Sequence, residues 1–141
     1  MNLIPSSDRS ADGLPFSLAG RFRPWRFGVS HTELVLRSVA RPNDDDVVEL
    51  VFRGVIGMTL KSAYDSVVLA EASDARAAEI LRFTGVAGRP QAQRVRCLTL
   101  EPESEESFVA CVGFSVWSYP VDGAPAAIGK SRTDGTLLFR Q

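Results

Sequence analysis

The sequence predicts a mainly β (α+β) domain: roughly five to seven antiparallel strands in a curled sheet, a small barrel or a sandwich, with one short helix. Two long segments, residues 33–60 and 94–119, alternate apolar and polar side chains with a period of two. This period is typical of strands with one buried face. A third segment, after Ser73, carries the signals of a helix start.

Length and composition are those of one soluble domain. The chain has 141 residues, of which 45% are hydrophobic and 23% charged, and its net charge is −1 at pH 7. Such a charge gives no general attraction to nucleic acid or to an anionic membrane. We expect a flexible arm over residues 1–20 and a single β-rich domain over residues 21–141. The arm lacks the regions of a signal peptide, and no apolar run approaches the ~20 residues of a membrane helix, so a cytoplasmic protein is expected.

Residues 33–60 predict a long β-hairpin whose register follows from charge. If residue i faces residue 86 − i, Glu33 lies opposite Arg53 and Arg37 lies opposite Glu49. Such pairs contribute roughly 0.2–1 kcal/mol each. The turn then falls at residues 42–44, and glycines in the second arm predict a bend. The face that carries the charges is too apolar to stay uncovered, so we expect either that the sheet closes on itself or that another chain lies there. Its apolar members are Val35, Val39, Val47 and Val51.

The other elements follow from local signals. Residues 21–30 predict an edge strand or a lead-in to the hairpin, because Pro24 interrupts any ladder. A third strand is expected over residues 66–72, followed by a helix over 74–83 with Ser73 as its N-cap and Gly85 as its end. A second hairpin is predicted to join residues 94–100, an acidic loop at 101–107 and a strand over 108–119, with a last edge strand at 136–139.

Cys97 and Cys111 are the only cysteines, and each lies in one arm of the second hairpin. If this hairpin turns about Ser104, residue i faces residue 208 − i and the two thiols are directly opposed. Packed thiols, a redox-sensitive pair and, in an oxidising compartment, a disulfide are the alternatives. Two thiols and one distant histidine do not provide the four closely spaced ligands of a zinc site, so no metal is expected.

The motifs that suggest catalysis are incomplete. Residues 124–131, APAAIGKS, follow a P-loop pattern without its first glycine and without a helix after it, so we interpret them as a surface loop and expect no cofactor. Residues 113–115 imitate part of a nucleophile elbow, but Trp117 replaces the final glycine. His31 is the only histidine, and a structural role, a place in a binding surface and a catalytic role all remain open for it. We predict that the protein is not an enzyme.

Surface chemistry indicates binding to another protein. Acidic clusters fall in both predicted hairpin turns, and turns at the same end of the domain would form an anionic rim suited to a basic partner. Residues 21–27 mix arginines with aromatic side chains. The candidate partner-binding residues are His31, Trp25, Asp44, Asp45, Asp46, Glu103 and Glu105.

Residues 27–36, FGVSHTELVL, lead into a two-stranded meander. Over residues 27–60 the chain resembles small bacterial immunity proteins of polymorphic toxin systems, of the kind with an aromatic–His–acid signature before the first strand. Thr32 stands at the position of the acid in this chain. The resemblance implies a non-enzymatic protein that binds and blocks a partner.

The predicted function is therefore an interaction module, immunity-like, that binds a protein partner or a second copy through the sheet face or the acidic turns. Two alternatives remain. One is a small-molecule carrier with an apolar pocket between sheet and helix, and the other is an enzyme centred on His31. The residues expected to line the carrier's pocket are Phe52, Met58, Phe114 and Trp117.

Overall fold

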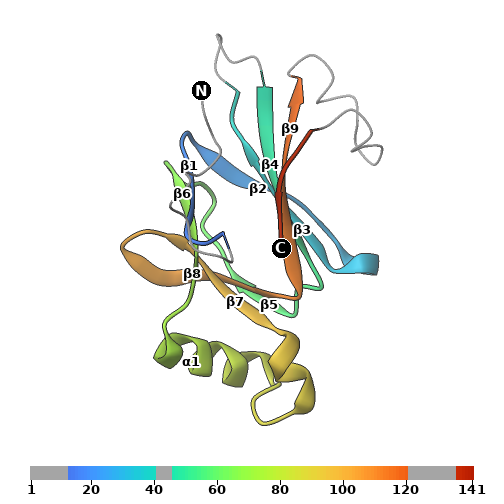
Figure 1. The fold of residues 1–141 in the computed structure, drawn as a ribbon, viewed down its shortest axis with the longest axis vertical. Coiled ribbons are helices and arrows are strands. Elements are labelled where there is room, and N and C mark those ends of the chain that lie inside the picture. Colours follow the sequence, from blue (N-terminus) through green and yellow to red (C-terminus); the bar gives the residue numbers. More distant parts are fainter. Residues whose placement is uncertain (1–12, 41–45, 121–135) are drawn as a thin grey trace.

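In a computed structural model of the chain, the described residues are 13–40, 46–120 and 136–141. They form two antiparallel sheets of five strands each (Figure 1). The mainly β fold with one α-helix is confirmed. The described residues contain ten strands, more than expected, and the two sheets do not close into a barrel.

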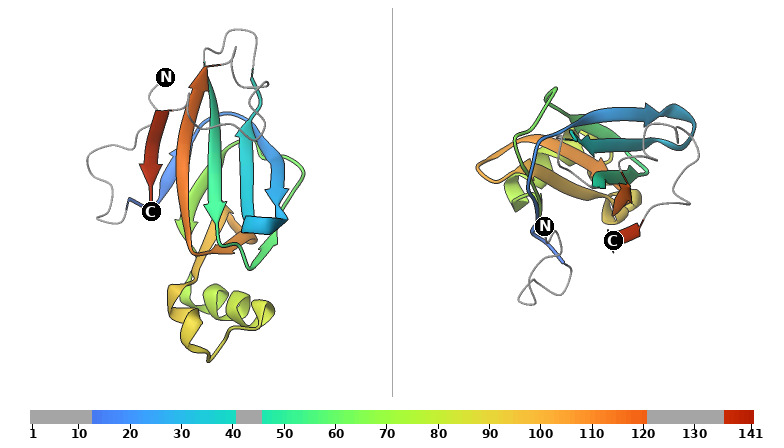
Figure 2. Two further views of the ribbon diagram at one scale, coloured as in Figure 1. Left: turned by 90° about the vertical axis from the view of Figure 1, so that its right-hand side faces the viewer. Right: turned by 90° about the horizontal axis from the view of Figure 1, so that it is seen from above.

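The first sheet has the order β1-β6-β7-β8-β5, and the second has the order β10-β9-β4-β3-β2. The left view of Figure 2 shows the strands of the second sheet side by side. The strands of the first sheet are β1 (Phe16–Leu18), β6 (Val67–Glu71), β7 (Arg96–Glu101), β8 (Ser104–Cys111) and β5 (Gly57–Thr59). Those of the second are β10 (Thr136–Arg140), β9 (Gly113–Pro120), β4 (Asp46–Arg53), β3 (Glu33–Ser38) and β2 (Phe22–Gly28).

The predicted register of the first hairpin is confirmed where β3 meets β4. Leu36 pairs with Leu50 and Arg37 pairs with Glu49, whose Oε2 lies 3.7 Å from the Arg37 Nε. The Glu33 carboxylate, however, forms its ion pair with Arg26 of β2, at 3.8 Å, rather than with Arg53. The predicted turn at residues 42–44 lies outside the described residues.

The outer face of this hairpin is buried without closure of the sheet. Val47 packs with Tyr119 and Trp117, and the Trp25 ring lies over the Arg37 guanidinium at 4.5 Å. The expected closure of the sheet on itself is therefore wrong, and the alternative of a second chain over this face stays a prediction. The buried valines of this face are Val35, Val47 and Val51. The opposite face packs against the first sheet in one core, whose members include Phe16, Phe22, Phe52, Phe114, Leu34, Leu50, Leu69 and Leu98.

Two chain segments cross between the sheets next to each other. β4 leads into β5 through Gly54, whose φ is +64°, and β8 leads into β9 through Val112. The Val112 N–H donates to the Arg53 carbonyl at 2.9 Å, which holds the two crossings together. The predicted bend is confirmed, but the predicted unbroken strand over 108–119 is wrong. Val112 is 58% exposed, and the alternation of buried side chains changes phase there.

The second hairpin has a different register from the predicted one. Its turn is Glu101–Ser104 with Pro102 at the second position, and a register shift lies between Thr99 and Glu101. Residues 104–107, expected in a loop, belong to β8. The ladder pairs Arg96 with Cys111 and Cys97 with Ala110, so the prediction of opposed thiols is wrong. Both cysteines are free and buried, on opposite faces of the sheet.

The helix α1 (Asp74–Thr84) lies across one end of the first sheet (Figures 1 and 2). Its predicted caps are confirmed: the Ser73 hydroxyl accepts from the Arg76 N–H, and Gly85 ends the helix with a φ of +83°. Ile80 is its buried residue and packs with Cys97, Phe108 and Ala110. Two short 3-10 helices, η1 (Val29–His31) and η2 (Pro90–Arg94), complete the described elements. None of the described helices has the length and apolar character that a bilayer span requires.

The packed domain begins before residue 21, where the sequence placed its start. β1 pairs with β6, and its Phe16 and Leu18 side chains are buried in the shared core. Residues 1–12 of the expected arm lie outside the described residues. The two predicted edge strands are confirmed as β2 and β10, and β2 has a register shift between Pro24 and Arg26.

Candidate functional site

The structure divides the candidate partner-binding residues into three groups. Trp25 and His31 lie on β2 and η1, Asp46 begins β4, and Glu103 and Glu105 belong to the β7–β8 hairpin. Figure 1 shows the β7–β8 turn on the left, well separated from the start of β4 at the top and from η1 on the right. Asp46 and the β7–β8 turn therefore do not form one rim. Asp44 and Asp45 lie outside the described residues.

His31 and Trp25 occupy an exposed edge of the second sheet. The His31 imidazole is exposed at the end of η1, and it has no hydrogen-bond or ion-pair partner within the described part of the chain. Trp25 is 36% exposed, and the guanidinium groups of Arg23 and Arg37 both contact its ring. The edge carries Pro24 and a register shift, and both features disfavour the pairing of a further strand.

Glu103 and Glu105 lie in one groove, which we call the acidic groove. It has a volume of about 740 Å³ and runs over the outer face of β6 and β7. Four glutamates line it, and none of the described residues that line it is a lysine or arginine. Its lining residues are Pro15, Val68, Ala70, Glu71, Ser73, Thr99, Glu101, Pro102, Glu103, Ser104 and Glu105.

The groove exists because its floor carries small side chains. Val68, Ala70 and Thr99 alternate with the core-facing residues of β6 and β7, and Ala70 pairs with Thr99 across the ladder. The outer face next to them, at Cys97 and Phe108, is covered by α1. The groove is therefore the part of this face that α1 leaves uncovered.

The four glutamates differ in their partners. Glu71 forms an ion pair with Arg96, and the Glu101 Oε2 lies 2.7 Å from the Lys61 Nζ. Glu103 is exposed and has no partner among the described residues. The Glu101 Oε1 is buried, and no donor among the described residues reaches it. A buried carboxylate oxygen without a donor is uncommon in native proteins and can accept one from a ligand.

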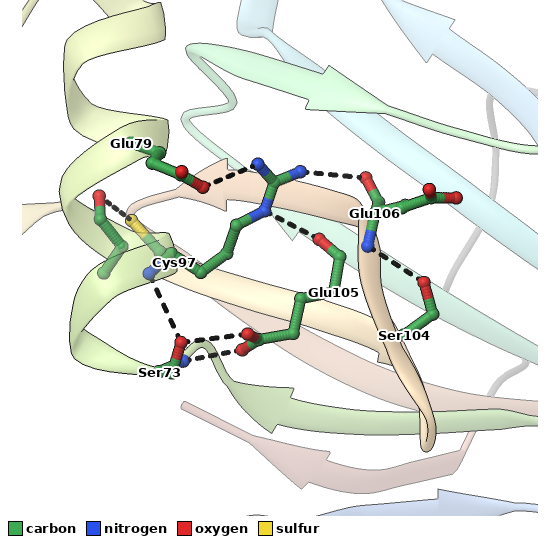
Figure 3. A network of polar contacts seen from close by, with 8 residues as sticks. Ser73, Glu79, Cys97, Ser104, Glu105 and Glu106 are labelled. Atoms are coloured by element: carbon green, nitrogen blue, oxygen red, sulfur yellow. Dashed lines mark hydrogen bonds and ion pairs between the residues drawn. The ribbon is translucent and has the colours of Figure 1, made fainter.

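Glu105 has a structural role at one wall of the groove (Figure 3). Its carboxylate accepts from the Ser73 N–H at 2.7 Å and from the Ser73 hydroxyl at 2.9 Å. Arg76 donates to the carbonyls of Glu105 and Glu106 and pairs with Glu79 at 3.1 Å. The hydrogen bonds from Ser73 lower the pKa of Glu105. This network fixes the start of α1 to β8 and so fixes one side of the groove.

Two of the groove's glutamates, Glu103 and Glu105, were predicted as partner-binding residues. Glu101 was placed in the same acidic loop but was not selected, and Glu71 was missed. Glu71 ends β6, and Glu101 ends β7 directly before the turn proline. The register Glu101–Ser104 brings them together. Pro102, which favours the second position of a turn, was the signal that could have located it.

The structure also bears on the carrier's pocket, the elbow-like motif at residues 113–115, the P-loop-like segment and a metal site. Phe52 and Phe114 are fully buried with ring centroids 6.3 Å apart, so the core fills the space expected for a carrier's pocket. Gly113–Ser115 begin the continuous strand β9, as predicted. Residues 124–131 lie outside the described part. Within the residues that the structure describes, no cluster of His, Cys, Asp and Glu could hold a metal ion.

Comparisons with known proteins gave no match: no protein-family model matches the chain, and no curated protein or solved structure is significantly similar to it.

Proposed function

We propose that the protein is a non-enzymatic interaction module that binds a basic, extended segment of a partner protein in the acidic groove. The observation that carries the proposal is the lining of this groove: four glutamates and no lysine or arginine around a volume of about 740 Å³. Glu71 and Glu101 pair with Arg96 and Lys61, which lie outside the lining, so the lining keeps a net negative charge. Such a charge in a concave surface attracts a ligand of opposite charge and raises its association rate.

The shape of the groove favours an extended segment. Its floor of Val68, Ala70 and Thr99 follows two neighbouring strands, and its acidic groups lie around this floor. An extended peptide places alternate side chains on one side, so a lysine or arginine at every second position can reach the glutamates. The buried Glu101 Oε1, which lacks a donor among the described residues, would accept one from such a side chain.

The resemblance to immunity proteins agrees with this proposal. It implies a protein that binds and blocks a partner, and the acidic groove gives such binding a location. The groove lies on the first sheet, whereas residues 27–36, which contain the signature, belong to β2, η1 and β3 at the edge of the second sheet.

The test uses a fluorescently labelled peptide of alternating lysine and threonine, which we call the Lys–Thr peptide. We expect saturable binding by fluorescence anisotropy, weakened by added salt because the groove's charges are partly exposed. A matched peptide of alternating glutamate and threonine should not bind. Equal binding of the two peptides would contradict the proposal.

Matched variants locate the binding. Glu103→Gln removes a groove charge that has no partner among the described residues, whereas Asp46→Asn removes an exposed charge at the start of β4. We expect Glu103→Gln to weaken binding by up to about fivefold, the usual effect of one exposed ion pair. Asp46→Asn should leave it unchanged. Ala70→Phe, which fills the floor, should abolish it.

A further inference from the structure

The outer face of the second sheet contains a separate depression, which we call the cationic hollow. It has a volume of about 340 Å³, at the lower end of the range for small-molecule sites. It lies on the sheet that faces the viewer in the left view of Figure 2. Its lining residues are Glu33, Val51, Arg53, Ser115, Trp117 and Arg140.

The sheet register explains the depression. Val51 pairs with Ser115, and Ser115 pairs with Arg140, so two small side chains form the floor beside a long one on the edge strand. The next pair along the ladder is Arg53 with Gly113, and a Cβ at residue 113 would lie 2.7 Å from the Arg53 Nη2. The absence of a side chain at Gly113 therefore leaves room for the Arg53 guanidinium.

The hollow has more hydrogen-bond donors than acceptors. The Arg53 guanidinium has only two long contacts, 3.5 Å to the Ser115 Oγ and 3.3 Å to a main-chain oxygen of Gln141, and no aspartate or glutamate among the described residues pairs with it. Arg140 is exposed and has no partner in the described part of the chain. The Glu33 carboxylate, the acidic group of the hollow, already pairs with Arg26 at 3.8 Å.

Ser115 adds a donor at the floor. It is buried, and its Oγ accepts from the Trp117 Nε1 at 2.8 Å and from Arg53. With both lone pairs directed at these donors, the hydroxyl hydrogen remains to be donated. No acceptor for it lies among the described residues. The same hydrogen bond fixes the Trp117 indole as a wall of the hollow.

We propose that the cationic hollow binds a small organic anion. Arg53, Arg140 and the Ser115 hydroxyl hold its acid oxygens, and its flat apolar part lies against Trp117. Carboxylates and phosphate esters share this chemistry, because each presents acceptor oxygens to guanidinium donors. The site is independent of the acidic groove, which lies on the other sheet and attracts the opposite charge.

The experiment titrates the full chain with benzoate, with phenyl phosphate and with neutral benzyl alcohol, and follows the indole N–H signals of Trp25 and Trp117 by NMR. The assignment comes from Trp25→Phe. We expect at least one of the two anions to shift the Trp117 signal saturably, with benzyl alcohol lacking this effect. Which anion binds more tightly identifies the acid group.

Matched variants test the donors. Arg140→Gln, on an exposed edge strand, should weaken binding of the anion about tenfold, as expected for one charge-assisted hydrogen bond, and Arg53→Gln should do the same. Arg89→Gln, which removes an exposed charge near η2, should leave the affinity unchanged. The proposal is overturned if neither anion shifts Trp117, if benzyl alcohol binds equally well, or if Arg140→Gln has no more effect than Arg89→Gln.

Discussion

Glu105 was expected to meet a partner, and the structure instead uses its carboxylate to support a helix cap. Two hydrogen bonds from Ser73 hold it, while Ser73 itself caps α1. The neighbouring Glu103 has no such bonds among the described residues. Two acidic residues that look alike in sequence therefore differ in role, and only Glu103 keeps its charge fully available to a ligand.

This difference predicts a pH dependence of stability. The hydrogen bonds from Ser73 lower the pKa of Glu105 in the folded state. Their stabilisation is therefore complete above the pKa of the unfolded chain, about 4.3, and is lost as pH falls through the lower folded pKa. We expect Glu105→Gln to lower the melting temperature at pH 7, with a difference from wild type that shrinks in acid. Glu103→Gln serves as control; an equal, pH-dependent effect there would contradict the assignment.

The two cysteines provide a second prediction at this scale. Burial raises the pKa of Cys111 to about 12 and also raises that of Cys97, so little thiolate forms near neutral pH. We expect both thiols to react with a disulfide-exchange reagent only as fast as the protein unfolds. Mass spectrometry after mild oxidation of the folded chain should find two free thiols, because Cys97 and Cys111 point to opposite faces of their sheet. An intramolecular disulfide in the folded chain would refute this register.

At the scale of elements, the two hairpins show what sequence pattern can determine. Charge pairs and apolar alternation agree on one register for β3 and β4, and Arg37 does face Glu49. In β7 and β8 the acidic residues suggested a long loop, whereas a turn at Pro102 and a register shift near Leu100 move the pairing by one residue. A shift of this kind leaves little trace in composition, and it reverses the face of every side chain beyond it.

Only one of the two crossings between the sheets could be predicted from the sequence. Gly54 indicated a bend, but nothing in residues 108–119 marks the passage of Val112 from one sheet to the other. The reason lies in tertiary contacts. The Val112 side chain packs against Gly54, and a Cβ added at Gly54 would lie 2.7 Å from the Val112 Cγ2. The floor of the acidic groove depends likewise on which part of the sheet α1 leaves uncovered.

The contact between Gly54 and Val112 predicts the outcome of a double-mutant cycle. Gly54→Ala and Gly85→Ala both place alanine at a positive φ, which costs about 1–3 kcal/mol, but only Gly54 has a neighbour within 4 Å. Urea denaturation should show a larger loss for Gly54→Ala. Adding Val112→Ala should recover the excess, since Val112 is exposed and its truncation alone costs little. Strict additivity of the two changes would argue against the contact.

At the scale of the whole molecule, the strand β1 belongs to the packed domain. The sequence placed residues 1–20 in an arm because polar and turn-forming residues dominate it, and composition cannot show that Phe16 and Leu18 lie on the buried face of β1. Phe16 is fully buried, and its ring centroid lies 4.7 Å from that of Phe139 in an edge-to-face arrangement. The strand thus joins the two sheets through their shared core.

Phe16→Ala tests this placement. We expect a loss of about 3–5 kcal/mol in the free energy of unfolding, the usual cost of truncating a buried phenylalanine. Phe83→Ala is the matched control, because the Phe83 ring is 67% exposed and only its packing against Phe108 is lost. Chemical denaturation measures both. Equal effects of the two substitutions would place Phe16 outside the core.

The two sheets present outer faces of opposite chemistry. The acidic groove lies on one, and the cationic hollow lies on the other. Because a shared core separates them, a basic protein segment and a small anion could occupy their sites independently. A net charge of −1 for the whole chain conceals this separation.

The most direct measurement for the central proposal is a backbone amide NMR titration of the full chain with the Lys–Thr peptide. Binding in the acidic groove predicts saturable shifts at Val68, Ala70, Thr99 and Glu103, with the surface around Trp25 and His31 unaffected. Absence of shifts, or shifts confined to β2 and η1, would contradict the proposal.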